Sequence, residues 1–108
     1  TYCIQCHGTD AGGGPGFPNL RDGAWLWGGD PDTIKLTITG GRTGAMPAWG
    51  PVLGDNVKDV AAYVLSLSGK QVDGDRELGK QKFQELCIAC HGPEGKGNPA
   101  LGAPDLTD

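Results

Sequence analysis

The chain has no run of apolar residues near the ~20 that a helix needs to cross a bilayer, so no membrane-spanning helix is expected within it. It also lacks a basic surplus. Nine Lys and Arg stand against 13 Asp and Glu, and the net charge of -4 argues against a nucleic-acid partner. Aromatic residues make up only 6%, which leaves little material for a large core. All four cysteines lie in two short motifs, so no thiol remains for a structural disulfide.

Glycine, by contrast, is abundant, at 20 of 108 residues against a usual share of about 7%. Ordering so many glycines costs backbone entropy. A small domain of this composition needs a constraint beyond its own core, such as a metal, a disulfide or a covalently held group.

The two cysteine motifs are Cys3-Ile4-Gln5-Cys6-His7 and Cys87-Ile88-Ala89-Cys90-His91. The spacing Cys-x-x-Cys-His is the attachment signature of a c-type haem. Two cysteines three positions apart on a helical turn project to the same side, where each thiol can form a thioether with one haem vinyl group. The histidine that follows then directs its imidazole at the iron. We therefore predict two covalent haem c groups, with His7 and His91 as iron ligands.

Two other interpretations of the cysteines are weaker. A redox dithiol is expected beside alternating strands and helices, which this chain lacks. A zinc ion needs four ligands, which the two cysteine pairs can supply together. That arrangement leaves both histidines and the internal repeat unexplained.

The segment after the first motif contains a predicted helix. Asp30 and Pro31 fit an N-cap and a first helical residue, and Gly40-Gly41 fits a helix end. Between them, residues 33–39 alternate apolar and polar, which on propensity alone favours a strand. We predict a short helix, because the caps fit and the chain offers no partner strand.

Two further helices are predicted, over residues 55–68 and 75–86. The first carries an apolar stripe and ends at Gly69. Tyr63 lies off that stripe and is expected to pack against a helix that precedes the first motif in a complete unit. The second helix has apolar residues on one side, and Gly79 on that face permits close approach of another helix.

Met46 is the only methionine, and it lies in the loop 41–49 with Pro47 directly after it. A thioether is a soft, neutral ligand suited to haem iron. Filling a gap in the core is the alternative role of a single methionine. Because a haem motif lies upstream, we predict Met46 as the second ligand of the first haem iron, opposite His7. The second iron then has His91 and no second ligand from this chain.

Four residues are candidates for the haem surroundings. Pro18 can present its carbonyl to the far ring nitrogen of His7, or it simply forms a turn. Trp27 and Trp49 are suited to covering a haem edge, although packing elsewhere is an equal alternative. Arg42 is suited to pairing with a haem propionate or to lying free in solvent.

The sequence contains an internal repeat. Cys3 corresponds to Cys87, and Pro18 corresponds to Pro104 with two extra residues in between. We predict a first cytochrome c unit over 1–69 without its N-terminal helix, a polar linker over 70–74, and the start of a second unit over 75–108 without its distal half. The fold class is all-α, with two tandem cytochrome c-like units of short helices and loops around haem. The second haem is expected to be held less firmly than the first.

Several strings resemble the dihaem subunit of cbb3-type cytochrome c oxidases across nearly the whole chain. They are His7-Gly8, Pro15 to Leu20, Trp25 to Gly29, Met46 to Gly50, Val57 to Gly69 and His91 to Pro104.

This resemblance implies two cytochrome c folds on the periplasmic side of the bacterial inner membrane, held there by an anchor outside these residues. It implies haem thioethers at Cys3, Cys6, Cys87 and Cys90. It also implies electron transfer from a soluble donor cytochrome toward the oxygen-reducing subunit, with the other oxidase subunits as partners. The acidic surface would steer a basic donor. The chain itself would have no catalytic residue.

Two alternatives stay open, and the first of them shares every ligand. One is a soluble periplasmic dihaem carrier. The other is a dihaem enzyme in which one iron keeps an open position.

Overall fold

The computed structural model, which describes residues 1–108, contains short helices and no strand. Its elements are α1 (Ile4–His7), α2 (Pro31–Gly40), α3 (Gly50–Leu53), the 3-10 helix η1 (Gly54–Asn56), α4 (Val57–Leu67), α5 (Arg76–Leu86) and α6 (Ile88–His91). Strand-like pairing is limited to two isolated bridges. The predicted all-helical class is therefore confirmed. None of the helices is long and apolar enough to span a membrane.

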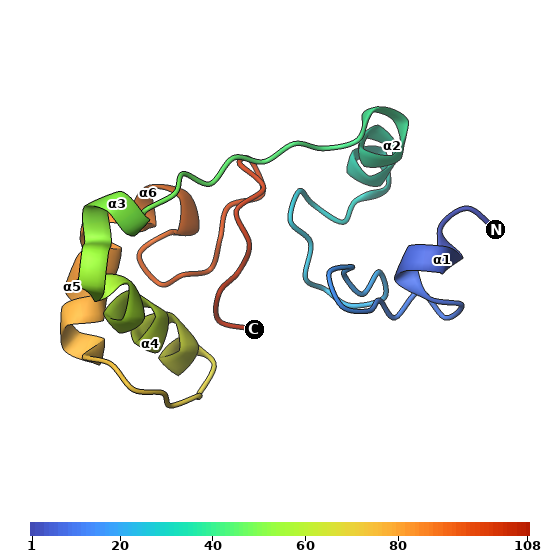
Figure 1. The fold of residues 1–108 in the computed structure, drawn as a ribbon. Helices are drawn as coiled ribbons and strands as arrows, with labels where there is room; N and C mark the ends of the chain where they lie inside the picture. Colours follow the sequence, from blue (N-terminus) through green and yellow to red (C-terminus); the bar gives the residue numbers. More distant parts are fainter.

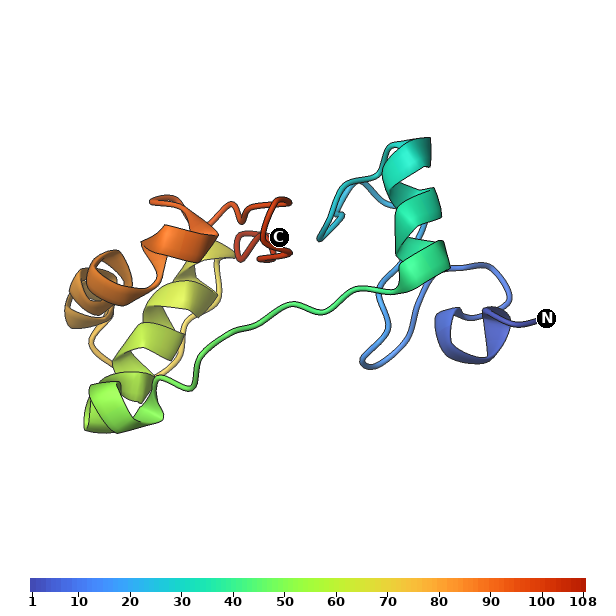
Figure 2. The same ribbon diagram turned by 90° about the horizontal axis from the view of Figure 1, so that it is seen from above.

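The chain is arranged in two parts joined by an extended segment, and its overall dimensions are 45 × 24 × 23 Å. In both ribbon views α1 and α2 lie on one side and α3 to α6 on the other, with residues 41–49 running between them (Figures 1 and 2). The N-terminus lies at the outer end of the first part. The C-terminus lies between the two parts.

The core is small and belongs entirely to the second part. Seven of 108 residues are buried, namely Leu53, Asp59, Ala62, Gly79, Phe83, His91 and Gly95. Phe83 is the largest fully buried side chain. This distribution follows from the scarcity of large apolar residues. The small core forms where two amphipathic helices pack together.

Those two helices are α4 and α5, which pack side by side as a hairpin (Figures 1 and 2). At Gly79 the two backbones approach so closely that a Cβ atom would overlap the carbonyl oxygen of Asp59. The close approach predicted for Gly79 is therefore confirmed. Next to it, the rings of Tyr63 and Phe83 meet edge to face, with centroids 5.3 Å apart. Tyr63 thus packs on α5, and α5 takes the place of the helix expected to cover it.

A buried carboxylate ties the two helices together. Asp59 in α4 accepts a hydrogen bond from the backbone N–H of Asp75, at 2.8 Å, and another from the side-chain amide of Asn56, at 3.0 Å. Asp75 is itself the N-cap of α5, and its carboxylate accepts from the N–H of Leu78. The Asp75 N–H, followed by the Asn56 amide, lowers the pKa of Asp59 below its ordinary 3.8.

The predicted helices are present. Asp30 accepts from the N–H of Thr33 at 3.0 Å, and α2 begins at Pro31, so the helix predicted over the alternating segment is confirmed. Gly41, with φ of 69°, ends it. The helix predicted over 55–68 is α4, preceded by one turn of 3-10 helix.

The hairpin crosses the expected boundary between units. Helix α4 lies in the predicted first unit and α5 in the second, and residues 70–74 form the turn between them. The packing in this structure therefore joins the end of one predicted unit to the start of the next. The division at 69 and 75 stays a prediction.

We expect Gly79→Ala to lower the free energy of unfolding by about 1–3 kcal/mol, because the new methyl group has no room against the Asp59 backbone. Gly40→Ala is the matched control, since Gly40 is also helical and has open space around it. We expect that control to be neutral or slightly stabilising. Urea unfolding followed by circular dichroism measures both, and equal effects would contradict the packing described.

We expect Asp59→Asn to destabilise the chain near neutral pH. The lowered folded-state pKa of Asp59 contributes stability that is fully present above 3.8 and is lost as the pH falls below that value. The difference in urea midpoint between the variant and the parent should therefore narrow below that pH. Asp55→Asn is the control, because Asp55 is exposed. A difference that does not change with pH would contradict the role given to this carboxylate.

Candidate functional site

The two Cys-x-x-Cys-His motifs adopt the same local structure. In each, the first cysteine is the N-cap of a single helical turn, and both caps have helical backbone angles (Cys3 φ -99°, Cys87 φ -105°). Each turn ends at the histidine. The glycine that follows has positive φ, 85° at Gly8 and 78° at Gly92, which turns the chain away from the helix.

The loops after the histidines also match. The His7 carbonyl accepts from the N–H of Gly13 and the His91 carbonyl from that of Gly97, both at 2.8 Å. An isolated bridge then closes each loop, between residues 14 and 17 in one and between 98 and 103 in the other. The second loop is longer within this bend, where the sequence predicts two extra residues. The local repeat is thus a feature of the structure as well as of the sequence.

Each histidine ring is oriented by a proline carbonyl. The Nδ1 atom of His7 lies 3.0 Å from the carbonyl oxygen of Pro18, and that of His91 lies 3.1 Å from the oxygen of Pro104. The hydrogen bond predicted for Pro18 is confirmed. Because Nδ1 donates to the carbonyl, Nε2 is the nitrogen left to bind a metal. Sequence reasoning did not select Pro104 as a site residue, although the repeat pointed to it.

The two motifs differ in how far they are covered. Cys3 and Cys6 are exposed and His7 is half-buried, with the ring of Phe17 against it at 5.9 Å between centroids. His91 is buried, with 7% of its surface exposed, and Cys87 is half-buried. The second motif is therefore the more enclosed of the two, although Cys90 is exposed.

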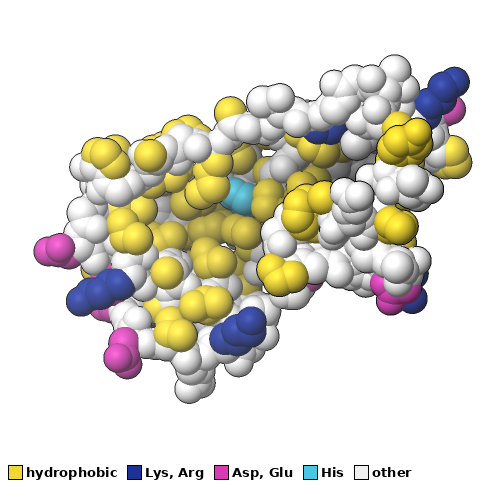
Figure 3. All heavy atoms as spheres, turned by 45° about the vertical axis from the view of Figure 1, so that its right-hand side comes forward, with side chains coloured by type: hydrophobic (Ala, Val, Ile, Leu, Met, Phe, Trp, Pro, Cys, Tyr) yellow, Lys and Arg dark blue, Asp and Glu magenta, His cyan; other side chains and the backbone are white.

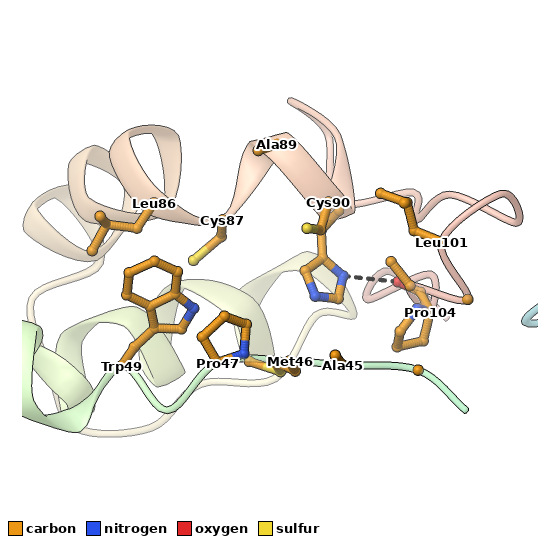
Figure 4. Close-up of a pocket in the computed structure, with 14 residues that line it drawn as sticks. Ala45, Met46, Pro47, Trp49, Leu86, Cys87, Ala89, Cys90, Leu101 and Pro104 are labelled. Carbon is orange, nitrogen blue, oxygen red and sulfur yellow. Dashed lines mark hydrogen bonds between the residues drawn. The ribbon is translucent and has the colours of Figure 1, made fainter.

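A cavity of about 400 Å³ lies at the second motif. Its walls are mostly apolar and come from the α5–α6 junction, from the loop at 101–104 and from the segment 44–49. The surface view shows a histidine ring in a hollow among hydrophobic side chains (Figure 3). In the close-up, Cys87 and Cys90 approach from one side, while Ala45, Met46 and Pro47 cross the other (Figure 4). Leu86, Leu101 and Ala103 also line the cavity, and only their closeness to the motif in the sequence could have indicated them.

Met46 and Trp49 both line this second cavity. The structure therefore places Met46 in the wall of the cavity that His91 also lines, and the pairing of Met46 with His7 on one iron stays a prediction. The Met46 side chain is 74% exposed, so it does not fill a gap in the core. Of the residues predicted around the first haem, Pro18 contacts the first motif through its hydrogen bond to His7, whereas Trp49 lies at the second.

Trp27 and Arg42 form a contact between the two parts of the chain. The Trp27 ring packs against Gly102 in the loop of the second motif, and lies 3.6 Å from where a Cβ atom of Gly44 would be. The Arg42 guanidinium stands 5.0 Å from the centre of that ring, and its Nε donates to the Thr37 hydroxyl at 3.1 Å. The positive charge predicted to face a haem propionate thus faces an indole in this structure.

The side chains of the second cavity suit a covalently held haem. Two thiols lie on one helical turn, an oriented imidazole follows, and the walls are apolar. Burial, and then the neighbouring Cys90, raise the pKa of the Cys87 thiol. The four cysteines do not converge, and no three His, Cys, Asp or Glu side chains are grouped to hold a metal ion. The zinc interpretation is therefore not supported by the arrangement of the ligands.

Comparison with known proteins agrees with this geometry. Residues 1–64 match the family model of cytochrome c oxidase, cbb3-type, subunit III, and residues 76–108 match that of cytochrome c. The chain belongs to the cbb3-type oxidase subunit III family. Membership in this family and the cytochrome c match imply covalently bound haem c.

Relatives of this subunit III chain are named as cbb3-type oxidase subunits. The subunit CcoP of Rubrivivax gelatinosus is 56% identical over 98% of this chain, and FixPc of Rhizobium leguminosarum bv. viciae is 47% identical over 98%. CcoP of Cereibacter sphaeroides is 40% identical over the whole chain. The chain spans 36%, 41% and 42% of the length of these three relatives.

We expect Trp27→Ala to make Arg42 more accessible to trypsin, because the guanidinium loses the ring it lies over and the segment 41–49 loses the ring that lies near Gly44 and packs on Gly102. Losing about 1–1.4 kcal/mol of local contact corresponds to cleavage about five- to tenfold faster. Phe17→Ala is the matched control, because the Phe17 ring packs on His7 within the first part of the chain. Mass spectrometry of the fragments gives both rates, and equal rates would contradict this contact.

Proposed function

We propose that this chain carries two haem c groups and transfers electrons through them. Thioethers at Cys3 and Cys6 would hold one haem, and thioethers at Cys87 and Cys90 the other, with His7 and His91 as iron ligands. The observation that carries this proposal is the shared geometry of the two motifs. Both place two cysteines on one helical turn, and both have a histidine whose Nδ1 is bonded to a proline carbonyl.

A bound haem c supplies a one-electron iron couple, and the residues of this chain set the conditions for it. The cysteines fix the haem relative to the helical turn. The carbonyls of Pro18 and Pro104 hold each imidazole in one tautomer and orientation. At the second motif, Leu86, Leu101 and Ala103 give the cavity apolar walls. Apolar surroundings and a fixed imidazole limit the reorganisation that accompanies a change of charge, which suits electron transfer rather than bond making.

For the whole protein, we propose that electrons pass from a soluble donor cytochrome toward the oxygen-reducing subunit of a cbb3-type oxidase. The names of the relatives support this assignment, as does the match to subunit III. The net charge of -4 favours a basic donor whose association weakens as salt rises. The other oxidase subunits would be its partners, and the periplasmic side of the bacterial inner membrane its location. The subunit itself would have no catalytic residue.

The count of haems tests this proposal. The chain is produced together with machinery that attaches haem c, and its mass is measured under denaturing conditions. We expect the mass of two haems. Cys3→Ser with Cys6→Ser should remove one, Cys87→Ser with Cys90→Ser the other, and all four substitutions both. A parent chain with no covalent haem, or one that carries zinc in its place, would contradict the proposal.

A further inference from the structure

We propose that Asp105 is a positioning residue for His91, that Asn19 does the same for His7, and that the charge of Asp105 makes the two haem sites unequal. Each of the two side chains directly follows the proline whose carbonyl accepts a hydrogen bond from the histidine ring, drawn as a dashed line at Pro104 in Figure 4. The inference rests on the proposed function, because it requires a haem at each motif. It gives a reason why two motifs of the same local geometry would hold haems of different reduction potential.

The first argument concerns the peptide group that carries the carbonyl. A peptide group is planar, so a change in the direction of this carbonyl also changes the backbone angle φ of the next residue, Asn19 or Asp105. Both residues fix their own backbone in the same way. The side-chain oxygen accepts from the N–H two residues further on, that of Arg21 in the first motif and that of Thr107 in the second, at 2.8 Å in each. The direction of the carbonyl therefore depends on the side chain at this position.

The second argument is that a glycine packs against the same peptide group. A Cβ atom at Gly13 would lie 2.8 Å from the carbonyl carbon of Pro18, and one at Gly97 would lie 2.7 Å from that of Pro104, so neither contact has space for a side chain. Both glycines have φ of 84°, and each donates its N–H to the carbonyl of the histidine, at 2.8 Å. Because this contact is so close, a shift of the turn after the proline is passed on to the histidine.

The third argument is that the two positions differ in charge. Asp105 accepts a second hydrogen bond, from the Thr107 hydroxyl at 2.6 Å, and that hydroxyl accepts from the Lys96 ammonium at 2.9 Å. The Thr107 hydroxyl, followed by the Thr107 N–H and then the charge of Lys96, lowers the pKa of Asp105 below its ordinary 3.8, so the carboxylate is ionised at neutral pH. Asn19 is neutral. A negative charge near a haem stabilises the ferric iron, so this contribution favours a lower potential at the second haem.

Exchanging this one position between the motifs tests the proposal. Asp105→Asn gives the second motif the neutral amide of the first, and Asn19→Asp gives the first motif the charge of the second. Both changes keep the oxygen that accepts from the backbone, whereas Asp105→Ala and Asn19→Ala remove it. Each variant is made in a chain with a single haem, obtained by replacing the two cysteines of the other motif with serine. The mass of each chain first shows that its haem is attached.

Two measurements separate position from charge. The midpoint potential of the haem responds to the charge and to the strength of the histidine hydrogen bond. The rate at which the Nδ1 proton of the histidine exchanges with solvent, followed by NMR in the ferric chain, reports on the hydrogen bond to the proline carbonyl.

We expect Asp105→Asn to raise the midpoint potential of the second haem, because one partly screened negative charge is lost. At a fixed applied potential the ratio of reduced to oxidised haem should rise about two- to threefold. The Nδ1 proton of His91 should exchange at the parent rate. Asn19→Asp should lower the potential of the first haem and leave the exchange at His7 unchanged.

We expect Asp105→Ala to speed the exchange of the His91 proton about tenfold, as the loss of roughly one hydrogen bond's net free energy would do. It should also raise the potential above that of Asp105→Asn, because a more weakly bonded imidazole is a poorer donor to the iron. Asn19→Ala should speed the exchange at His7 in the same way. If one alanine variant does not retain its haem, the other still tests the positioning role.

Glu94→Gln is the matched control, since it removes the same charge from an exposed side chain of the same loop. It should shift the potential less than Asp105→Asn does and leave the proton exchange unchanged. Alanine variants whose histidine proton exchanges at the parent rate would overturn the positioning role. A potential that Asp105→Asn changes no more than Glu94→Gln does, or that Asn19→Asp raises, would overturn the role of the charge. Failure of the proposed function looks different, because then no covalent haem is attached to the parent chain.

Discussion

The contact on which the rest of this structure depends is the close packing of α4 on α5 at Gly79. The absence of a side chain lets the α5 backbone reach the carbonyl of Asp59, and the Tyr63 and Phe83 rings close the interface beside it. Asp59 then fixes the start of α5 by accepting from the N–H of its N-cap residue. With so few large apolar residues, the chain gathers its buried side chains around this one interface. The cavity at the second motif forms at one end of it, where α5 leads into α6.

The two motifs show what local sequence determines and what it leaves to packing. Cys-x-x-Cys-His-Gly specifies a helical turn, a glycine that reverses the chain, and a loop that returns a proline carbonyl to the histidine. Both copies form this arrangement, although one lies against a core and the other does not. The side of each motif that orients the histidine is thus built from residues close together in the sequence. The opposite wall of the cavity at the second motif comes from elsewhere in the chain, from residues 44–49.

This distinction explains how much could be predicted from the sequence. The helix over 31–40 followed from its caps, which outweighed an alternating pattern typical of strands. The hydrogen bond from His7 to Pro18 and the close approach at Gly79 followed from single residues with few other roles. The helix that packs on α4 could not be predicted, because an amphipathic stripe indicates that a helix will be covered but does not indicate which segment covers it. Met46 was assigned to the motif upstream of it on chain order, and its pairing with His7 stays a prediction. In the structure the segment before α3 lines the cavity at the second motif, a placement that no local pattern indicates.

In tandem repeats of this kind, the last helix of one unit can change the helix on which it packs. Two units with equivalent helices present equivalent faces, so the last helix of one can pack on the first helix of either. Loop length then favours the nearer helix. Residues 70–74 join α4 to α5 through a turn, and closing so short a loop costs little entropy. If α4 packed on a helix preceding the first motif, a longer loop would have to be closed, at a greater cost in entropy. That arrangement would be competitive only if the helix fitted α4 at least as closely as α5 does. In this chain the fit at Gly79 and the short turn both favour the packing of α4 on α5.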